Sequence, residues 1–423
     1  MILGAGVTGL TAGITTGEEI YEAKEIAGGI CASYYVDLNN RKNFFRADEA
    51  SYRFEIGGGH WIFGVDNEIY NFLSHFTKLK GYFRNSLVYL PDFDLFVPYP
   101  IQNHLYYLPE KLRKKILSEI LDLKNRNIDK NFNTMEEWLL ENFGKTLCEI
   151  FFFPFHELYT AGLYKKISVQ DEFKTPVNYD LIINGAESET PPVGYNVKFF
   201  YPEKGLDDLI ENLKRKCRIN FNKKVKKIDI KKNEVYFEDG EIKKYEKIIS
   251  TLPLNKMLEI TGIDLGEKPP YTSVLVVNIG AKRNDRTPDA HWIYIPKSKS
   301  GFHRVGFYSN VDKSFLPKNL NNNVSVYVEK SYKGGKKLLE SEINKLCKMI
   351  VDELQEWKFI GDIDVIDWNW IEVAYTFQYS GSNWRENALE LLNKNNIIQI
   401  GRYGKWKFQG IAESIKDGLR IKK

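Results

Sequence analysis

The chain has 423 residues, more than a single hydrophobic core usually supports, so we expect two or three domains. Its 60 basic and 56 acidic residues nearly balance and the lysines are dispersed, which argues against a nucleic-acid-binding surface. The four cysteines are widely separated, no run of about 18 apolar residues occurs, and the chain opens on an apolar strand. We therefore expect a cytoplasmic protein without a disulfide framework, a metal site or a membrane span.

The first element is a short apolar strand that runs into a glycine-rich turn and a helix. Ile2 and Leu3 end the strand, and Gly4, Gly6 and Gly9 follow with the G-x-G-x-x-G spacing of dinucleotide-binding βαβ units. These glycines permit a tight turn, close approach of a pyrophosphate and close packing of the helix, whose N-terminal amides face the anion. The segment therefore predicts a dinucleotide site.

A second short strand ends in an acidic residue, as such a unit requires. Glu22 follows Ile20 and Tyr21 and is the expected partner of a ribose hydroxyl, and the pair Gly28-Gly29 comes next. The interval from Gly9 to Glu22 is shorter than the usual spacing of about 20 residues. The first helix must therefore be short, or the loop after it tight.

Another glycine cluster, GGGH at residues 57–60, follows a strand-like segment and would let the backbone approach a flat or bulky group. Beyond it we expect a helix over 68–82 and strands over 87–99. Helical spacing of apolar residues over 109–167 predicts a helical insertion, and the composition of 174–194 predicts a loop or linker.

The second half of the chain alternates between strands and isolated helices. A helix is expected over 206–216, with strands at 224–230, 234–237 and 247–250. Residues 271–375 are predicted to form mostly strands, with one helix near 338–357. Residues 397–419 are predicted to form a strand, a glycine loop and a helix.

The whole pattern predicts an α/β (α+β) multidomain fold. A discontinuous, Rossmann-like FAD-binding domain is expected over 1–66, 181–255 (with a sheet segment) and 381–423. A helical insertion with cleft loops is expected over 67–180, and a mostly antiparallel β-sheet substrate domain over 256–380. Large flavoproteins assemble the nucleotide domain from separated parts, whereas NAD dehydrogenases usually keep it continuous, so this organisation favours FAD.

Four segments together resemble the UDP-galactopyranose mutase family, over nearly the whole chain. They are the N-terminal glycine unit, GGGH at 57–60, FVPYPIQN at 96–103 and GRYGKWKF at 401–408. The last two resemble the eukaryotic-type enzymes more than the bacterial ones. The nucleotide motifs are shared with amine and protoporphyrinogen oxidases, so the middle motifs carry the distinction.

The resemblance implies a noncovalent FAD that is active when reduced. Its N5 atom would attack the anomeric carbon of a UDP-galactose-like nucleotide sugar and displace UDP, and the resulting adduct would let the ring open and close as the furanose. Eukaryotic-type relatives take electrons from NADPH, which makes NADPH a candidate reductant here. The oligomeric state is left open.

The resemblance also implies roles for individual residues of this chain. The catalytic positions are His60, Tyr294, Arg304 and Tyr375, with Tyr379 as the alternative to Tyr375. The cofactor-binding positions are Gly4, Gly6, Thr8, Gly9, Glu22, Gly28, Gly29, Gly58, Gly59, His60, Val225, Gly401, Arg402 and Ile411. The substrate-binding positions are Tyr99, Gln102, Asn196, Trp292, Tyr294, Arg304, Tyr375 and Phe408.

Two positions depart from the family pattern. No arginine occurs between residues 167 and 176, where a second diphosphate ligand is usual, and Lys174 is the nearest cation. Phe408 stands where the final phosphate-binding tyrosine is expected. Two alternatives therefore stay open: an FAD-dependent oxidase or desaturase of the amine or protoporphyrinogen oxidase type, and a flavin-bound sugar-nucleotide binding protein without turnover.

The alternatives differ in what they require of the cleft. The mutase hypothesis predicts that Tyr294, Arg304 and Tyr375 converge near the flavin, because a diphosphate needs a guanidinium fork and hydroxyl donors. The oxidase hypothesis predicts an apolar cleft that Arg304 does not reach.

Overall fold

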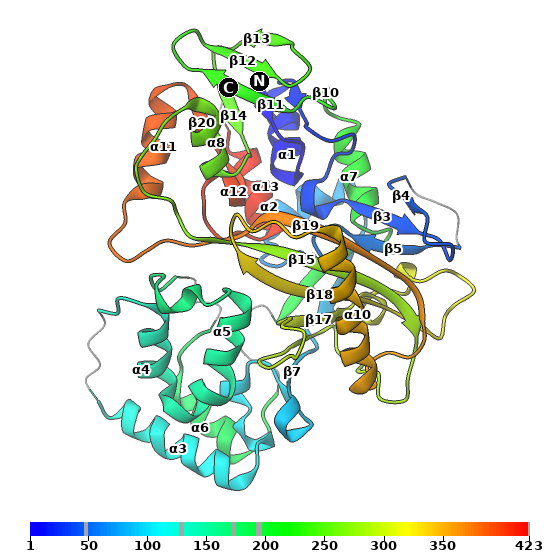
Figure 1. The fold of residues 1–423 in the computed structure, drawn as a ribbon, viewed down its shortest axis with the longest axis vertical. Coiled ribbons are helices and arrows are strands. Elements are labelled where there is room, and N and C mark those ends of the chain that lie inside the picture. Colours follow the sequence, from blue (N-terminus) through cyan, green and yellow to red (C-terminus); the bar gives the residue numbers. More distant parts are fainter. Residues whose placement is uncertain (46–49, 127–130, 171–174, 192–196, 422–423) are drawn as a thin grey trace.

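The computed structural model describes residues 1–45, 50–126, 131–170, 175–191 and 197–421 (Figure 1). It confirms the predicted α/β multidomain fold, because a parallel sheet, a large mostly antiparallel sheet and a helical unit are all present. In Figure 1 the parallel sheet lies at the top with both chain ends, the large sheet crosses the middle, and the helical unit lies below.

The parallel sheet is assembled from three distant parts of the chain. Its strand order is β10 (Ile219–Asn220), β2 (Ile20–Tyr21), β1 (Ile2–Leu3), β14 (Ile248–Ser250) and β20 (Ile397–Gln399). Helices α1 (Val7–Thr16) and α13 (Ile411–Leu419) pack against each other, and α7 (Leu206–Lys214) also contacts α1. Because the strands run parallel, their carboxyl ends meet at one edge, where nucleotides bind in such sheets.

The short interval between the glycine turn and Glu22 is explained by the length of α1. The helix has ten residues and ends at Gly17, whose φ of 73° lies in the left-handed region that glycine adopts readily. The chain then reaches the start of β2 at Ile20 within three residues.

The large sheet has the order β19 (Ile363–Thr376), β15 (Tyr271–Lys282), β18 (Asn323–Lys333), β17 (Arg304–Phe307), β16 (Trp292–Tyr294), β7 (Ser86–Leu90) and β8 (Leu95–Pro98). All of its neighbouring strands are antiparallel except β16 and β7. Alternate residues point to opposite faces: Val326 and Val328 pack with α10 (Glu340–Glu356), whereas Tyr327 packs towards the nucleotide domain. The two faces of β18 therefore belong to different cores.

The helical unit contains α3 (Glu110–Lys124), α4 (Met135–Leu147), α5 (Phe153–Tyr159) and α6 (Tyr179–Glu187). It has its own core, which includes Ile116, Trp138, Phe143 and Phe152. The prediction of a loop throughout 174–194 is wrong over α6. The Asn178 side chain caps this helix by accepting a hydrogen bond from Leu181 N at 3.1 Å, and Ile182 is buried in the core.

The predicted helix over 68–82 is also partly wrong. Helix α2 (Asn67–Ser74) ends early, and the chain continues as β6 (Leu79–Phe83), which pairs with β9 (Lys198–Pro202). The partner strand lies more than 100 residues further along, so the local pattern carries no sign of it.

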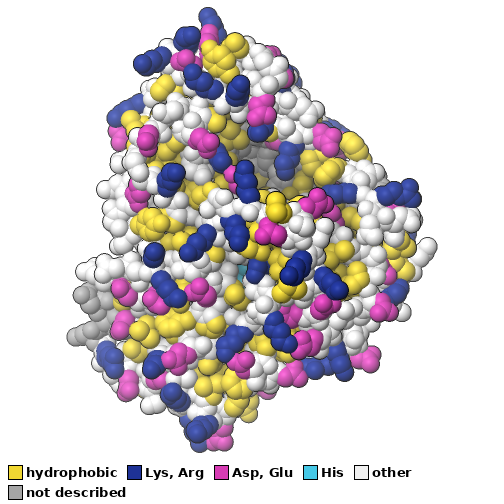
Figure 2. All heavy atoms as spheres, viewed as in Figure 1, with side chains coloured by type: hydrophobic (Ala, Val, Ile, Leu, Met, Phe, Trp, Pro, Cys, Tyr) yellow, Lys and Arg dark blue, Asp and Glu magenta, His cyan; other side chains and the backbone are white. Residues whose placement is uncertain are grey.

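The remaining α-helices and strands complete the fold of the described residues. They are β3 (Ser33–Val36), β4 (Lys42–Asn43), β5 (Tyr52–Glu55), β11 (Val225–Asp229), β12 (Glu234–Phe237), β13 (Ile242–Lys244), α8 (Leu254–Thr261), α9 (Tyr308–Val311), α11 (Trp384–Lys394) and α12 (Gly401–Gly404). Within the described ranges, no helix is both long and apolar enough to cross a lipid bilayer. Basic and acidic side chains are interspersed over the face shown in Figure 2.

Candidate functional site

The N-terminal glycine turn is packed on one side and open on the other. A Cβ added at Gly9 would lie 1.9 Å from the carbonyl oxygen of Gly4, whereas a Cβ at Gly6 would meet no atom within 4 Å. Gly6 is the residue that immediately precedes α1, so the open space lies at the N-terminus of a helix. This is the geometry that a pyrophosphate requires, and the glycine turn fits the adenosine-diphosphate half of FAD.

Other predicted cofactor residues lie around the same turn. The Glu22 carboxylate accepts a hydrogen bond from Ala5 N at 2.7 Å. Gly28 forms a parallel bridge with Gly6, and a Cβ at Gly29 would lie 3.5 Å from the Cα of Gly6. The acidic residue and both downstream glycines are therefore neighbours of the first motif.

The C-terminal motif meets the N-terminal one. A Cβ at Gly401 would lie 2.7 Å from Thr8 Oγ1, and α13, which begins at Ile411, packs along α1. Val225 starts β11 and packs on the hydrophobic cluster that contains Tyr21. Segments from near the two ends of the chain thus lie together at the edge of the parallel sheet where a nucleotide is expected.

The triple-glycine turn presses against β18 of the large sheet. A Cβ at Gly59 would lie 2.4 Å from the Tyr327 hydroxyl oxygen, and one at Gly58 would lie 2.9 Å from a carboxylate oxygen of Glu329. Gly58 has a φ of 78°. Only glycine lets the turn come this close to the sheet.

His60 closes the triple-glycine turn in a neutral state. Its Nδ1 lies 2.9 Å from the Gly58 carbonyl oxygen, and its backbone N donates to the Glu55 carboxylate at 3.1 Å. Burial lowers the pKa of His60 to about 4, even though the Gly58 carbonyl and the charge of Glu329 act in the opposite direction.

Two rows of side chains cross the large sheet on the face that meets this turn. Read across β16, β17 and β18, they are Tyr294, Arg304 and Glu329 in one row and Trp292, Gly306 and Tyr327 in the other. Positions two apart on a strand share a face, so the rows are neighbours. A Cβ at Gly306 would lie 1.9 Å from the Tyr327 ring, so the glycine makes room for that ring.

The first row contains a buried ion pair. Arg304 donates a hydrogen bond from Nη2 to Glu329, which is only 2% exposed. The Tyr375 hydroxyl donates to the other carboxylate oxygen at 3.4 Å, and His303 Nε2 lies 3.6 Å from it. Burial opposes the charge on Glu329, but the Arg304 guanidinium and His303 outweigh it and hold the pKa of Glu329 below its usual range.

Aromatic rings line the space between the sheet and α5. The ring centroids of Tyr294 and Tyr99 are 4.5 Å apart, and Phe155 lies edge-on to Tyr294 at 5.5 Å. Tyr159 packs edge-on against Tyr375 at 4.7 Å. The facing surfaces of the sheet and α5 therefore bring flat aromatic rings beside hydroxyl groups.

Arg402 adds a second cation to the cluster. Its guanidinium carbon lies 5.3 Å from the Tyr375 ring centroid and 4.5 Å from that of Phe408. Its Nη2 donates to the Ala374 carbonyl at 3.1 Å. Phe408, predicted to bind substrate, thus packs on a predicted cofactor residue.

The structure brings together most of the predicted catalytic positions. Tyr375 reaches Glu329, whereas the alternative Tyr379 forms an isolated bridge with Ile167. Gln102 is 1% exposed, and its Nε2 has no hydrogen-bond partner among the described residues. Asn196, a predicted substrate residue, and Lys174 lie outside the described residues.

Four residues of the cleft were missed from the sequence. They are Arg84, Phe155, Tyr159 and Glu329. Arg84 is 6% exposed and donates from Nη2 to the Tyr99 carbonyl at 3.0 Å. Alternation along β18 could have placed Glu329 beside Tyr327 on one face, but only the strand register shows that it faces Arg304. The other three come from segments with no recognisable motif.

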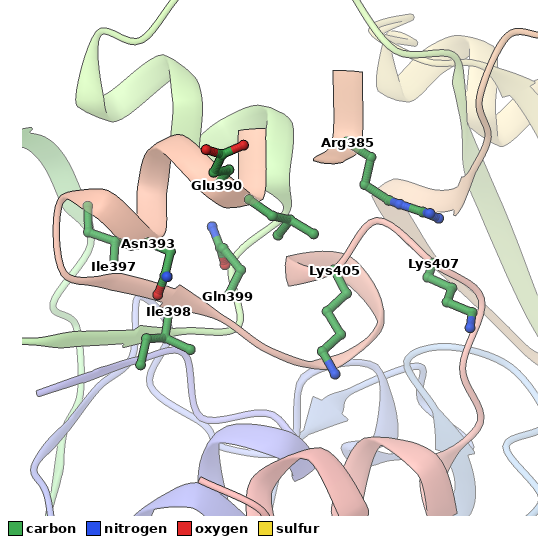
Figure 3. A pocket seen from close by; sticks show the side chains of 9 residues that line it. Arg385, Glu390, Asn393, Ile397, Ile398, Gln399, Lys405 and Lys407 are labelled. Atoms are coloured by element: carbon green, nitrogen blue, oxygen red, sulfur yellow. The ribbon is translucent and has the colours of Figure 1, made fainter. Parts of the chain in front are cut away.

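An open hollow on the surface is separate from this cluster. It has a volume of about 500 Å³ and lies between α11, β20 and the residues after α12 (Figure 3). Its lining includes Arg385, Leu389, Gln399 and Lys405, and none of the predicted site residues. The predicted site residues therefore lie apart from this hollow.

Comparisons with known proteins identify the family and agree with the fold. A family described as flavin containing amine oxidoreductase matches residues 10–418. The structure is similar to that of a reduced UDP-galactopyranose mutase, with a TM-score of 0.85 and 24% identity over 99% of this chain and 93% of that chain. It is also similar to a putative protoporphyrinogen oxidase from Exiguobacterium sp. 255-15, with a TM-score of 0.71 and 14% identity over 99% of this chain and 96% of that one. It is similar as well to a putrescine oxidase bound to putrescine, with a TM-score of 0.57 and 14% identity over 99% of this chain and 96% of that one. At these identities the structural similarities establish the fold.

Proposed function

The chain belongs to the flavin-containing amine oxidoreductases and is thus an FAD-dependent enzyme, and from this premise we propose that it is a pyranose–furanose mutase. Its substrate would be a nucleotide sugar of the UDP-galactose kind. The observation that carries the proposal is the convergence of Tyr294, Arg304 and Tyr375 on the sheet face that meets the triple-glycine turn.

The glycine turns would hold the cofactor. Gly4, Gly6 and Glu22 would bind its adenosine-diphosphate half, and Gly58 and His60 would face its ring system. When bound and reduced, the flavin supplies the nucleophile that replaces the nucleotide at the anomeric carbon of the sugar.

Arg304 would bind the diphosphate of the substrate. Its Nη2 is held by Glu329, but its Nε has no hydrogen-bond partner among the described residues, and 22% of its side chain is exposed. A guanidinium can hold two phosphate oxygens in one plane, so Arg304 would orient the nucleotide and stabilise it as it leaves. Tyr294 comes from β16, which is adjacent to β17, and Tyr375 comes from β19, which is separated from β17 by β18 and β15.

The protonation states of the histidines in the site suit a reaction that needs little acid–base catalysis by protein side chains. Burial lowers the pKa of both His60 and His303, so both imidazoles are neutral at physiological pH. The protein would then contribute position and electrostatics, and the proton balance of the sugar ring would be left to the substrate and cofactor.

A second candidate is an FAD-dependent oxidase or desaturase, favoured by the aromatic cleft walls. Tyr99, Phe155 and Tyr159 form a surface that would also accept an apolar chain or an amine. The buried ion pair of Arg304 and Glu329 argues for the mutase, because an apolar substrate would leave its remaining donors without a partner.

One experiment separates the candidates. Dithionite-reduced holoprotein is incubated with a panel of nucleotide sugars, and furanose products are sought by anion-exchange chromatography. In parallel, the oxidised protein is mixed with amines and oxygen uptake is recorded. We expect a nucleotide furanose product and no substrate-dependent oxygen uptake. Oxygen uptake with an amine, without any furanose product, would assign the chain to the oxidases. Tight UDP binding without product would favour a binding protein.

A further inference from the structure

The structure assigns to Glu329 the role of a positioning residue, which fixes the Arg304 guanidinium for the diphosphate. This inference rests on the proposed function and names a part of that site that lies in no sequence motif. Glu329 would not touch the reacting atoms. It would act through Arg304 and Tyr375.

Strand register brings the pair together. Arg304 on β17 lies directly opposite Glu329 on β18, and Tyr294 lies opposite Arg304 on the other side. Directly opposite positions on antiparallel strands place their Cβ atoms within about 5.5 Å of each other. The ion pair is therefore set by the backbone and does not depend on a mobile loop.

Both carboxylate oxygens of Glu329 are engaged, and on different groups. One accepts from Arg304 Nη2, and the other accepts from the Tyr375 hydroxyl at 3.4 Å and lies 3.6 Å from His303 Nε2. One carboxylate thus links two predicted phosphate ligands that come from separate strands, β17 and β19.

The contact leaves part of Arg304 available. Glu329 holds Nη2, and Nε is buried without a partner among the described residues, but the side chain keeps 22% of its surface exposed. Glu329 itself is 2% exposed and lies under the triple-glycine turn, where a Cβ at Gly58 would come within 2.9 Å of it. The anion is therefore shielded behind a guanidinium that is itself partly exposed, and we infer that the exposed part meets phosphate oxygens.

Loss of this support should affect turnover more than ground-state binding. In Glu329→Gln, Arg304 keeps its charge and still attracts the diphosphate, but a weaker acceptor no longer fixes its position. A misplacement of about 1 Å can cost roughly a hundredfold in rate. We expect the kcat of the reduced enzyme with UDP-galactose to fall by about 10- to 100-fold, while the KM and the Kd for UDP stay the same or decrease. In Glu329→Leu, which removes both acceptors, we expect a larger loss of kcat than in Glu329→Gln.

A matched control is available in Glu353, a second buried carboxylate on the far face of the large sheet. It is 3% exposed and accepts from Lys299 N at 2.7 Å and Ser300 N at 2.8 Å. Glu353→Gln should lower thermal stability by a similar amount and leave kcat and KM unchanged below the melting temperature.

The outcomes separate the inference from the proposed function. Values of kcat and KM for Glu329→Gln within twofold of wild type, or a loss fully explained by its FAD content, would overturn the positioning role. So would a KM that rises with unchanged kcat. If the wild-type protein neither binds UDP nor converts the sugar, the proposed function itself is wrong, and the role of Glu329 falls with it. Because Glu329→Leu can fail to fold, the isosteric Glu329→Gln keeps the test decisive.

Discussion

Three charged side chains near His60 are buried or half-buried. Arg304, Glu329 and Arg402 all act on the electrostatics of His60, and burial keeps that imidazole neutral. The chain thus places two guanidinium groups near His60, and guanidinium groups stay ionised when buried. The assignment of the ligand depends mainly on one of them, Arg304.

Replacing Arg304 should remove turnover and leave the cofactor in place. Arg304→Ala takes away the diphosphate cation but touches none of the glycine turns, so the FAD content measured by absorbance should stay at the wild-type level. Removing one electrostatic donor of this kind costs about 10²–10³ in kcat. Arg286→Ala, which removes a surface ion pair with Asp94, is the control. Near-normal turnover of Arg304→Ala would exclude the diphosphate role.

Glu55 predicts a pH dependence of stability. It is fully buried, and burial raises its pKa to about 8, although Tyr201, Arg53 and the His60 amide favour its charged form. Its folded pKa lies above the ordinary value of 4.5, so the stabilisation from the protonated form is complete below pH 4.5 and is lost as the pH rises towards 8.

Glu55→Gln should remove most of this dependence. The amide can accept from His60 N and donate to the Tyr201 hydroxyl oxygen, which now bonds the carboxylate at 2.5 Å. We expect a free energy of unfolding at pH 8 that exceeds that of the wild type by about 2–4 kcal/mol, and a smaller difference at pH 5. Denaturant titrations at both pH values measure it. Parallel pH profiles of the two proteins would contradict the account.

Among the elements, the glycine turn before α1 yields a contrast between two similar substitutions. Gly9→Ala would place a Cβ 1.9 Å from a backbone carbonyl oxygen, so we expect poor folding. Gly6→Ala meets no atom within 4 Å and has a φ of −68°, so the fold should be kept. Its methyl group would enter the space left for the pyrophosphate, and we expect at least a tenfold lower FAD affinity. Circular dichroism and FAD titration check both. Wild-type FAD affinity in Gly6→Ala would show that the pyrophosphate lies elsewhere.

The hydrophobic pattern of the sequence predicted those helices and strands whose formation depends mainly on residues that are close together in the chain. The periodicity of the chain anticipated β12 within its bounds, and α7 and α10 within a few residues, because burial on one face leaves a direct trace in the sequence. It failed at β6, whose partner strand is distant, and at α6, where proline and acidic flanks concealed a capped helix. It also could not show that Glu329 faces Arg304, since register is a tertiary property.

For the whole molecule, the nucleotide-binding edge depends on chain segments that are far apart in sequence. Strands from residues 2–3, 248–250 and 397–399 are neighbours in one sheet, and the cleft adds residues from the large sheet and from α5. The glycine motifs predicted the ligand class, which the family match supports, because their glycines are of the kind that let a nucleotide approach the backbone. The aromatic residues Phe155 and Tyr159 on α5 belong to no such motif. Only the packing of the helical unit against the sheet shows that they lie beside Tyr294 and Tyr375.

We propose that this assembly rearranges a nucleotide sugar without net oxidation. The most direct measurement follows UDP-galactofuranose and UDP-galactopyranose by chromatography with the protein in its oxidised and its dithionite-reduced states. We expect the reduced protein to interconvert the two forms over many turnovers without further consumption of reductant, and the oxidised protein to leave them unchanged. Equal conversion in both states, or no conversion by the reduced protein, would contradict the account.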